Sequence, residues 1–290
     1  MSFSTEIKEE LSKMTNLANK ELIKYELIGY LISSNTKVLK NNKMKFSTES
    51  EYNINRFAKL LKNLNIQDYD ISLSGKAYVI IIKTKYLLEF VQIDNDINII
   101  FNEQIKDLEQ IKTLIRGIFL GAGYINQPEN KYHLELNLSN ETNGNIVTQV
   151  LLENDIKGKT IKKKNEFSIY LKDGEEISKF FAFIGSNKGV IKFEEVRVQR
   201  QMNNKINRLV NCEAANLNKT INASIEQIEA IKKLQDENKF DQLDDNLKEL
   251  AMLRLENPNA SLIELGEMLS KPVGKSGVNY RLKKIIEIAK

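Results

Sequence analysis

The sequence holds few of the residues that many kinds of chemistry require. Cys212 is the one cysteine among 290 residues, which excludes an internal disulfide and fits a reducing compartment. Without a second thiol or a base at a suitable spacing, Cys212 is interpreted as a small buried residue. His133 is the one histidine, and it has no partner at metal-ligand spacing. We therefore expect His133 to be a partly buried strand residue rather than a ligand or a catalyst.

Long apolar runs are also absent. The run YVIII at 78–82 is far shorter than a membrane span, and the start MSFSTEIKEELSKM is charged, without the apolar centre of a signal peptide. These features predict a cytoplasmic protein with no membrane partner. A net charge of +4 and a pI near 8.8 permit a nucleic-acid partner without demanding one.

An internal repeat occupies the first two thirds of the chain. ELIGYLISSN (26–35) aligns with LIRGIFLGAGY when Gly29 is placed on Gly117, an offset of 88 residues. The same offset places the strand-like segment 43–50 on 131–138. Further matches are the helices 55–64 and 145–154, the strands 77–83 and 166–172, and the closing helices 84–93 and 175–184. Each copy is predicted to be a helix, a hairpin, a helix, a hairpin and a helix.

The glycines of the first helices have a packing explanation. A glycine inside a helix costs up to about 1 kcal/mol relative to alanine. Gly29 with Ser33, and Gly117 with Gly121, form small-xxx-small pairs that let two helix backbones approach closely. We therefore expect the first helices of the two copies to pack together at a pseudo-two-fold axis.

This arrangement resembles the LAGLIDADG homing-endonuclease fold over roughly residues 20–185. In that family each paired helix ends in an acid that binds a divalent metal at the scission centre. The matching positions here are Ser34 and Ala122, which cannot hold Mg²⁺ because it requires anionic oxygen ligands. The resemblance therefore implies the scaffold without a metal, a cofactor or nuclease chemistry.

After Gly185 the character of the chain changes. Residues 193–239 contain no proline or glycine, and apolar residues at helical spacing predict one or two helices with an inner face. That face consists of Ile206, Leu209, Val210, Leu217, Ile221, Ile225, Ile228 and Ile231. The polar face carries Arg197, Arg200, Lys205 and Arg208, which fit additional DNA contacts or a solvated surface equally well.

The last fifty residues predict a helix-turn-helix. A helix is followed by a turn at Asn257-Pro258 and a short helix capped by Ser261, with Glu264 completing a capping box. The final helix is expected to be capped by Ser276 and to turn Val278, Leu282, Ile285 and Ile286 inward. Residues 271–290 include six basic residues and one acid, as DNA docking needs. A three-helix protein-interaction bundle is the alternative.

Three segments in combination resemble the WhiA family of bacterial transcription regulators. They are RLVNCEAANLNKT (208–220), NPNASLIELGEML (257–269) and KSGVNYRLKKI (275–285), and the likeness runs the full length of the chain. The resemblance implies a DNA-binding regulator tied to sporulation and cell division, associated with the nucleoid. It also implies partners: promoter DNA, RNA polymerase with its sigma factor, and an iron-sulfur protein of the WhiB kind.

The sequence thus predicts an α+β fold: a duplicated αββαββα saddle over 1–185 (repeats at about 20–101 and 107–185), a helical linker over 186–240 and a helix-turn-helix over 241–290. The expected function is non-enzymatic, sequence-specific DNA binding, with Asn279 and Arg281 contacting bases. The full set of expected DNA-binding residues is Lys271, Lys275, Ser276, Asn279, Tyr280, Arg281, Lys283 and Lys284. The rivals are a protein-interaction scaffold and an active homing endonuclease.

Overall fold

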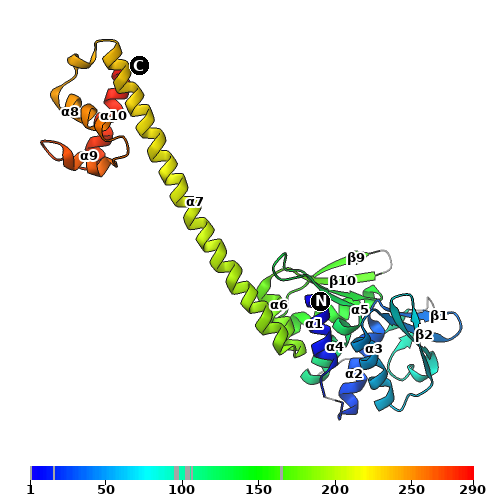
Figure 1. Cartoon of the computed structure of the whole chain (residues 1–290). Helices are drawn as coiled ribbons and strands as arrows, with labels where there is room; N and C mark the ends of the chain where they lie inside the picture. Colours follow the sequence, from blue (N-terminus) through cyan, green and yellow to red (C-terminus); the bar gives the residue numbers. More distant parts are fainter. Residues whose placement is uncertain (1, 16, 95–97, 102–104, 106, 164–165) are drawn as a thin grey trace. The chain divides into compact units, whose positions relative to one another are not determined.

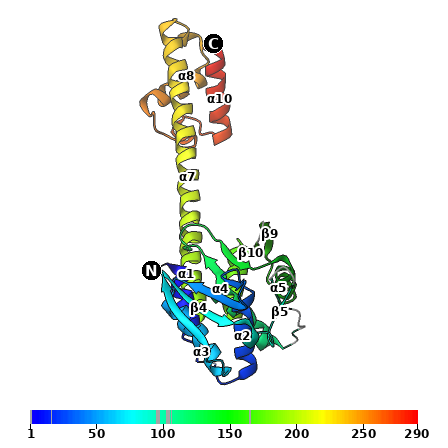
Figure 2. The same ribbon diagram turned by 90° about the vertical axis from the view of Figure 1, so that its right-hand side faces the viewer.

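A computed structural model of the chain describes residues 2–15, 17–94, 98–101, 105, 107–163 and 166–290 (Figure 1). The chain divides into two compact units, Met1–Gln201 and Met202–Lys290. The first unit contains two four-stranded antiparallel sheets, and Figure 2 shows the cyan strand β4 and the green strand β10 in their separate sheets. Among the helices of the described ranges, none has both the length and the apolar composition that a membrane span requires.

The first repeat forms one sheet with the strand order β1-β2-β4-β3. Its hairpins turn at Asn42 and Gly75, both of which adopt positive φ angles (55° and 63°). The elements of this repeat are α2 (Lys20–Ile32), β1 (Thr36–Leu39), β2 (Lys43–Thr48), α3 (Glu51–Asn63), β3 (Tyr69–Ser74), β4 (Ala77–Lys83) and the 3-10 turn η1 (Thr84–Tyr86).

The second repeat forms the other sheet with the matching order β7-β8-β10-β9, which confirms the predicted duplication. A two-stranded ribbon, β5 (Gln92–Ile93) with β6 (Ile99–Ile100), lies between the repeats in the sequence. The elements of the second repeat are α4 (Leu108–Ala122), β7 (Gly123–Ile125), β8 (Leu134–Leu138), α5 (Glu141–Glu153), β9 (Lys159–Lys163), β10 (Glu166–Leu171) and α6 (Gly174–Ile184).

The closing helix predicted for the first repeat is wrong. Residues 84–93 form only η1, a turn and β5, whereas the matching segment of the second repeat forms α6. The difference lies at the helix start: the Asp173 carboxylate accepts hydrogen bonds from the amides of Glu175 and Glu176, whereas Lys83 provides no such cap before η1. Apolar spacing alone was not sufficient to form the helix.

His133 lies just before β8 and not inside a strand, so that part of its prediction is also wrong. Its side chain is half-buried, as expected, and its ring stacks on Tyr170.

The paired helices α2 and α4 are in backbone contact. A Cβ atom added to Gly117 would lie 2.1 Å from the Glu26 carbonyl oxygen, and one added to Gly29 would lie 2.3 Å from the Leu114 carbonyl oxygen. At Gly121 the added atom would lie 2.4 Å from the Ser33 Oγ. No side chain fits at these distances, so the glycines are required by the close approach that the sequence predicted.

A buried ion cluster joins three helices of this unit. Arg56 of α3 donates two hydrogen bonds, of 2.6 and 2.8 Å, to the Glu26 carboxylate of α2. Arg116 of α4 lies 3.8 Å from the same carboxylate and donates from Nε to the Ile184 carbonyl oxygen at 2.8 Å. Burial lowers the pKa of Arg116. One carboxylate therefore holds two buried guanidinium groups in place.

Helix α1 (Phe3–Ser12) packs on α3, α4 and β7. It also supplies a side chain that caps the N-terminus of the long helix α7 (Asn187–Asp236). The Glu10 carboxylate accepts hydrogen bonds from the Ser186 hydroxyl and from the amides of Lys188 and Gly189. These groups begin α7, a single helix of 50 residues. An acid at a helix N-terminus is favourable because it faces the free amides and the positive end of the dipole.

Two predictions for α7 are wrong. The apolar positions from Ile206 to Ile225 are exposed, at 44–61% of their surface, instead of forming an inner face. Cys212 is exposed rather than buried. Ile231 is fully buried, since here α7 joins the core of the second unit.

The second unit is a small helical bundle. The end of α7 packs with η2 (Phe240–Gln242), α8 (Asp245–Glu256), α9 (Leu262–Met268) and α10 (Lys275–Ile288) around an apolar core. The predicted capping box of Ser261 and Glu264 is present. Ser276 is not a cap: α10 begins at Lys275 after Gly274, so the Ser276 side chain is exposed within the first turn.

The close contact between α2 and α4 predicts that adding one methyl group at Gly117 destabilises the protein. Gly117→Ala should lower the free energy of unfolding by about 3 kcal/mol, because the added Cβ overlaps a backbone oxygen that cannot move aside. Urea denaturation of the full chain measures this value. Gly277→Ala in α10 is the control, because its Cβ meets nothing closer than 3.4 Å and should stabilise its helix by roughly 0.5–1 kcal/mol. Equal effects of the two substitutions would contradict the close approach.

The buried cluster predicts a large cost for removing its acid. Glu26→Gln should destabilise the protein by about 3–5 kcal/mol, because Arg56 and Arg116 then stay buried without a counter-charge. The matched change Glu109→Gln breaks only an exposed pair with Lys112 and should cost less than about 1 kcal/mol. The stabilities of the two variants are compared by the midpoints of their chemical denaturation. If Glu26→Gln were as stable as Glu109→Gln, the buried ion cluster would not stabilise the protein as argued.

Candidate nucleic-acid interface

The two positions that match the nuclease acids lie at the ends of the paired helices. The Ser34 amide donates a hydrogen bond of 3.0 Å to the Asn137 carbonyl oxygen, and Ala122 is the buried last residue of α4. The Asn35 side chain donates to the Gly121 carbonyl oxygen at 2.8 Å, so it ties the two helix ends together. Within the described ranges no three His, Cys, Asp or Glu side chains gather as metal ligands.

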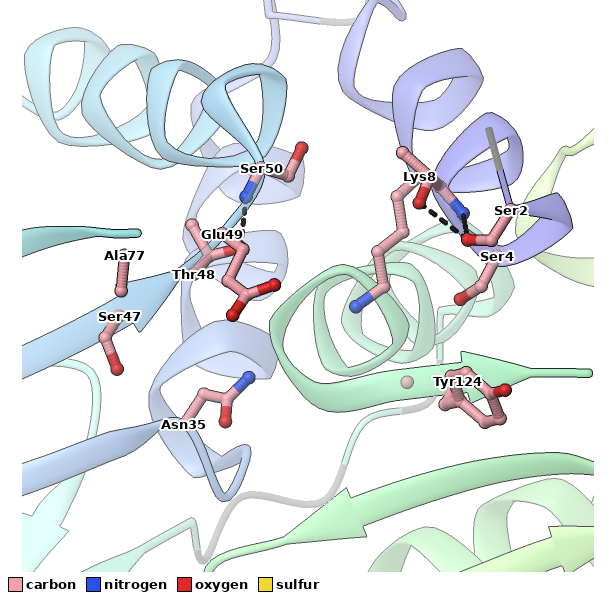
Figure 3. A pocket seen from close by; sticks show the side chains of 12 residues that line it. Ser2, Ser4, Lys8, Asn35, Ser47, Thr48, Glu49, Ser50, Ala77 and Tyr124 are labelled. Atoms are coloured by element: carbon pink, nitrogen blue, oxygen red, sulfur yellow. Dashed lines mark hydrogen bonds between the residues drawn. The ribbon is translucent and has the colours of Figure 1, made fainter. Parts of the chain in front are cut away.

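A hollow of about 510 Å³ opens at these helix ends, and Asn35 and Gly123 line it (Figure 3). Its walls carry hydroxyl groups, one lysine and one glutamate. The place where the resemblance expects paired acids thus offers polar groups without an acidic pair.

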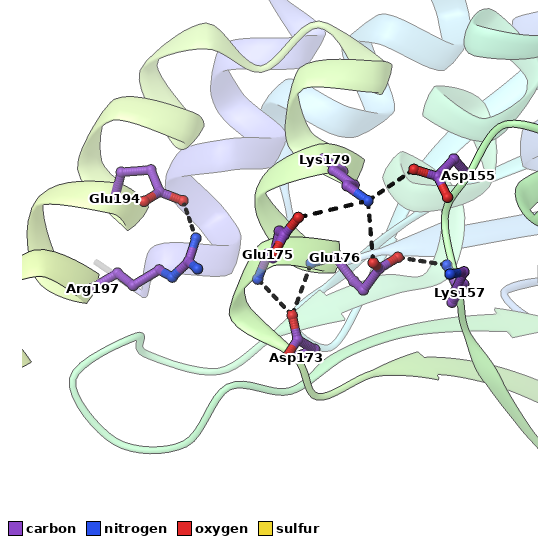
Figure 4. Close-up of polar contacts among 8 residues, drawn as sticks. All are labelled: Asp155, Lys157, Asp173, Glu175, Glu176, Lys179, Glu194 and Arg197. Atoms are coloured by element: carbon purple, nitrogen blue, oxygen red, sulfur yellow. Dashed lines mark hydrogen bonds and ion pairs between the residues drawn. The ribbon is translucent and has the colours of Figure 1, made fainter. Parts of the chain in front are cut away.

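The basic residues predicted on α7 fall into two groups. Arg197 donates to Glu194 at 2.9 Å (Figure 4), and Arg200 donates to the Pro128 carbonyl oxygen at 2.9 Å while its guanidinium lies 4.6 Å from the Tyr132 ring centroid. These two arginines serve the packing of the first unit. Lys205 and Arg208 are exposed.

Helix α10 carries most of the predicted DNA-binding residues, and its own core contacts fix which face is free. Val278, Leu282 and Ile285 are fully or almost fully buried against α8 and α9, while Tyr280 is 70% exposed. Ile286 is half-buried. The exposed predicted residues are Lys271, in the preceding turn, and Lys275, Ser276, Asn279, Tyr280, Lys283 and Lys284.

Arg281 and Asn279 do not share a face. Residues two positions apart in a helix point roughly 200° away from each other around its axis. Arg281 is half-buried on one flank, and Asn279 is exposed on the other. Lys284 lies 3.5 Å from Asp244, in an exposed pair that is easily broken.

A second hollow, of about 260 Å³, lies beside α10 within the second unit, and no pattern in the sequence indicated it. Lys275 and Asn279 of α10 line it together with Lys219 and Thr220 of α7 and the cap residue Ser261 of α9. No acid is among its lining residues. Lys219 and Thr220 belong to the candidate site only because α7 folds against α9 and α10.

Buried polar groups hold this arrangement. Arg254 of α8 is 2% exposed, and its Nη1 donates to the carbonyl oxygens of Asn257, Pro258 and Ala260. Ser224 of α7 also donates to Pro258, at 2.6 Å. The turn before α9 is therefore fixed to both α8 and α7, and burial lowers the pKa of Arg254.

The turn between α9 and α10 spans 269–274, longer than the usual three or four residues. It is ordered by Glu249, whose carboxylate accepts from both the amide and the hydroxyl of Ser270, and by the Val273 amide, which donates to Gly266. A longer turn is therefore compatible with a defined angle between the two helices.

Comparison with known proteins places both units in one family. Residues 111–203 match the family model described as the WhiA LAGLIDADG-like domain, and residues 206–289 match the WhiA C-terminal HTH domain. A protein of Clostridium tetani named "Probable cell division protein WhiA" is 37% identical and covers 100% of this chain and 97% of its own length. The protein of the same name from Clostridium novyi is also 37% identical, with coverages of 100% and 98%.

A solved structure agrees with these sequence matches. The crystal structure of full-length DUF199/WhiA from Thermatoga maritima is 28% identical, has a TM-score of 0.63 and covers 100% of this chain and 98% of that one. The likeness includes the LAGLIDADG-like sheets and the helix-turn-helix that are seen here. The chain belongs to the WhiA family.

Proposed function

We propose that this protein is a transcription regulator that binds specific double-stranded DNA through α10 and has no nuclease activity. The observation that carries the proposal is the free face of α10, where lysines, Asn279 and Tyr280 are exposed on a helix held by a buried core. Such a face fits the second helix of a helix-turn-helix lying in the major groove.

Within the proposal, the residues divide by chemistry and position. Lysines contact phosphates, and an asparagine can read adenine with two hydrogen bonds. Asn279 is assigned to a base contact, as the sequence predicted. Arg281, which the sequence also predicted to contact a base, is half-buried on a different face of α10 and is assigned to the DNA backbone instead. Lys271, Lys275, Ser276, Tyr280, Lys283 and Lys284 complete the proposed contact set, with Lys219, Thr220, Lys205 and Arg208 of α7 as further backbone contacts.

The proposed partner is promoter DNA. Because a promoter-bound regulator acts through the polymerase, the proposal includes RNA polymerase and its sigma factor. An iron-sulfur protein of the WhiB kind and a role in sporulation enter through the family resemblance. The relatives' names support a role in cell division.

The DNA-binding assignment predicts a specific salt dependence. Lys275→Ala with Lys283→Ala should weaken binding to duplex DNA and reduce the slope of log K against log salt by about 2, because two phosphate contacts are lost. Fluorescence anisotropy over a salt series measures both quantities. Lys232→Ala with Lys233→Ala removes the same charge from exposed positions of α7 and should leave the slope nearly unchanged. A wild-type chain with no salt-dependent binding would favour the scaffold alternative.

The degenerate acid positions predict an inactive nuclease centre. Plasmid DNA incubated with the protein and Mg²⁺ should stay uncut, because Ser34 and Ala122 offer no anionic oxygen to a metal. Gel electrophoresis of the plasmid reports the result, with a restriction enzyme as the positive control. Cleavage at a defined target would overturn this part of the proposal and favour the endonuclease alternative.

A further inference from the structure

One wall of the hollow at the ends of α2 and α4 carries a lysine that forms no ion pair among the described residues. Lys8 of α1 is half-buried, and Figure 3 shows its ammonium directed into the hollow. Its neighbour is the Phe119 ring, whose centroid lies 5.9 Å from Nζ. Among the ion pairs of the described ranges, none includes Lys8.

Burial acts on this lysine as expected for an uncompensated charge. Desolvation lowers the pKa of Lys8 to about 8. An anion bound in the hollow would favour the charged form of Lys8. A negatively charged ligand is therefore expected to bind more tightly here than a neutral one. A metal cation is disfavoured for the same reason, because Lys8 repels it and one glutamate is the whole acidic lining.

Several side-chain hydroxyl groups line the hollow together with the Lys8 ammonium. Ser4 is 6% exposed and lines the hollow on the same wall as Lys8 (Figure 3). Ser47 and the 49%-exposed Tyr124 line the space as well. None of these three hydroxyls has a hydrogen-bond partner within the described residues. Together with Lys8 they form a donor set that suits phosphate oxygens.

The wall opposite Lys8 carries a hydrogen-bond acceptor. Glu49 directs its carboxylate into the hollow across from Lys8 (Figure 3). A carboxylate accepts hydrogen bonds from the paired hydroxyls of a sugar, and it repels a continuous polyanion such as DNA. The ring of Tyr124 offers a face on which a base can stack.

We propose that this hollow binds a small phosphorylated ligand, a mononucleotide, with the phosphate on Lys8 and Ser4, the ribose hydroxyls on Glu49 and the base on Tyr124. A volume of about 510 Å³ lies in the range of small-molecule sites and admits a ligand of this size. The inference goes beyond the proposed DNA binding, because every lining residue belongs to the first unit. Its failure would leave the α10 assignment unchanged.

The test is calorimetric titration of the full chain with AMP, GMP, CMP and UMP, beside adenosine and inorganic phosphate. At least one mononucleotide should bind saturably, and the matching nucleoside should bind at least tenfold more weakly. Affinity should fall by roughly tenfold for each pH unit above about 8, because the neutral form of Lys8 no longer holds the phosphate. Titration between pH 7 and 9.5 avoids the second ionisation of the phosphate, near pH 6.

Three variants distinguish binding in this hollow from nonspecific attraction to the positive charge of the protein. Lys8→Met should weaken the nucleotide by at least tenfold, while the exposed Lys20→Met should leave it unchanged. Glu49→Gln, at an exposed position, should weaken the nucleotide but not inorganic phosphate. Thermal melting followed by circular dichroism confirms that each variant is folded.

Several results would overturn the inference. They are the absence of saturable binding by every nucleotide, equal affinity for inorganic phosphate, and an affinity that Lys8→Met leaves unchanged. Displacement of the nucleotide by a duplex oligonucleotide in the Lys275→Ala, Lys283→Ala variant would also overturn it, because the hollow would then be a DNA contact.

Discussion

The approach of two helix backbones at Gly29 and Gly117 is the constraint on which the first unit depends. Because a Cβ at either position would lie within 2.3 Å of a carbonyl oxygen of the other helix, α2 and α4 meet in one register. That register brings Glu26, Arg56 and Arg116 together, and it brings both helix ends to one place. The hydrogen bond from the Ser34 amide to Asn137 of β8 then joins the end of α2, in the first repeat, to the sheet of the second repeat.

The same geometry keeps the packing of the helix pair independent of the two positions that match the nuclease acids. The helix pair is held by glycine contacts and by a buried ion cluster, and neither includes the positions Ser34 and Ala122. Acids at those two positions are therefore not needed for folding. The hollow at these helix ends is lined by one lysine, Lys8 of α1, and one glutamate, Glu49.

In the second unit, the packing and the buried polar contacts hold α10 in a fixed direction with one face exposed. Arg254 and Ser224 fix the turn before α9, and Glu249 fixes the turn after it. These contacts use buried or half-buried polar groups that satisfy backbone atoms, so the free face of α10 needs no contact of its own to stay in place. The lysines on that face are exposed.

Local pattern in the sequence determined much of this protein. The repeat at an offset of 88 residues, the small residues of the paired helices and the capping box at Ser261 are patterns of residue spacing in the sequence, and each is present in the structure. The neutral residues Ser34 and Ala122, at the positions that match the acids of the nuclease family, were likewise readable from the repeat alone. Only the tertiary structure decided which apolar stripe is covered, as Ile206 and Ile231 show on one helix, and whether 84–93 forms a helix without a cap. It also decided that Lys219 and Asn279 line one hollow and that Lys8 and Glu49 line another, because residues far apart in a chain come together only through tertiary packing.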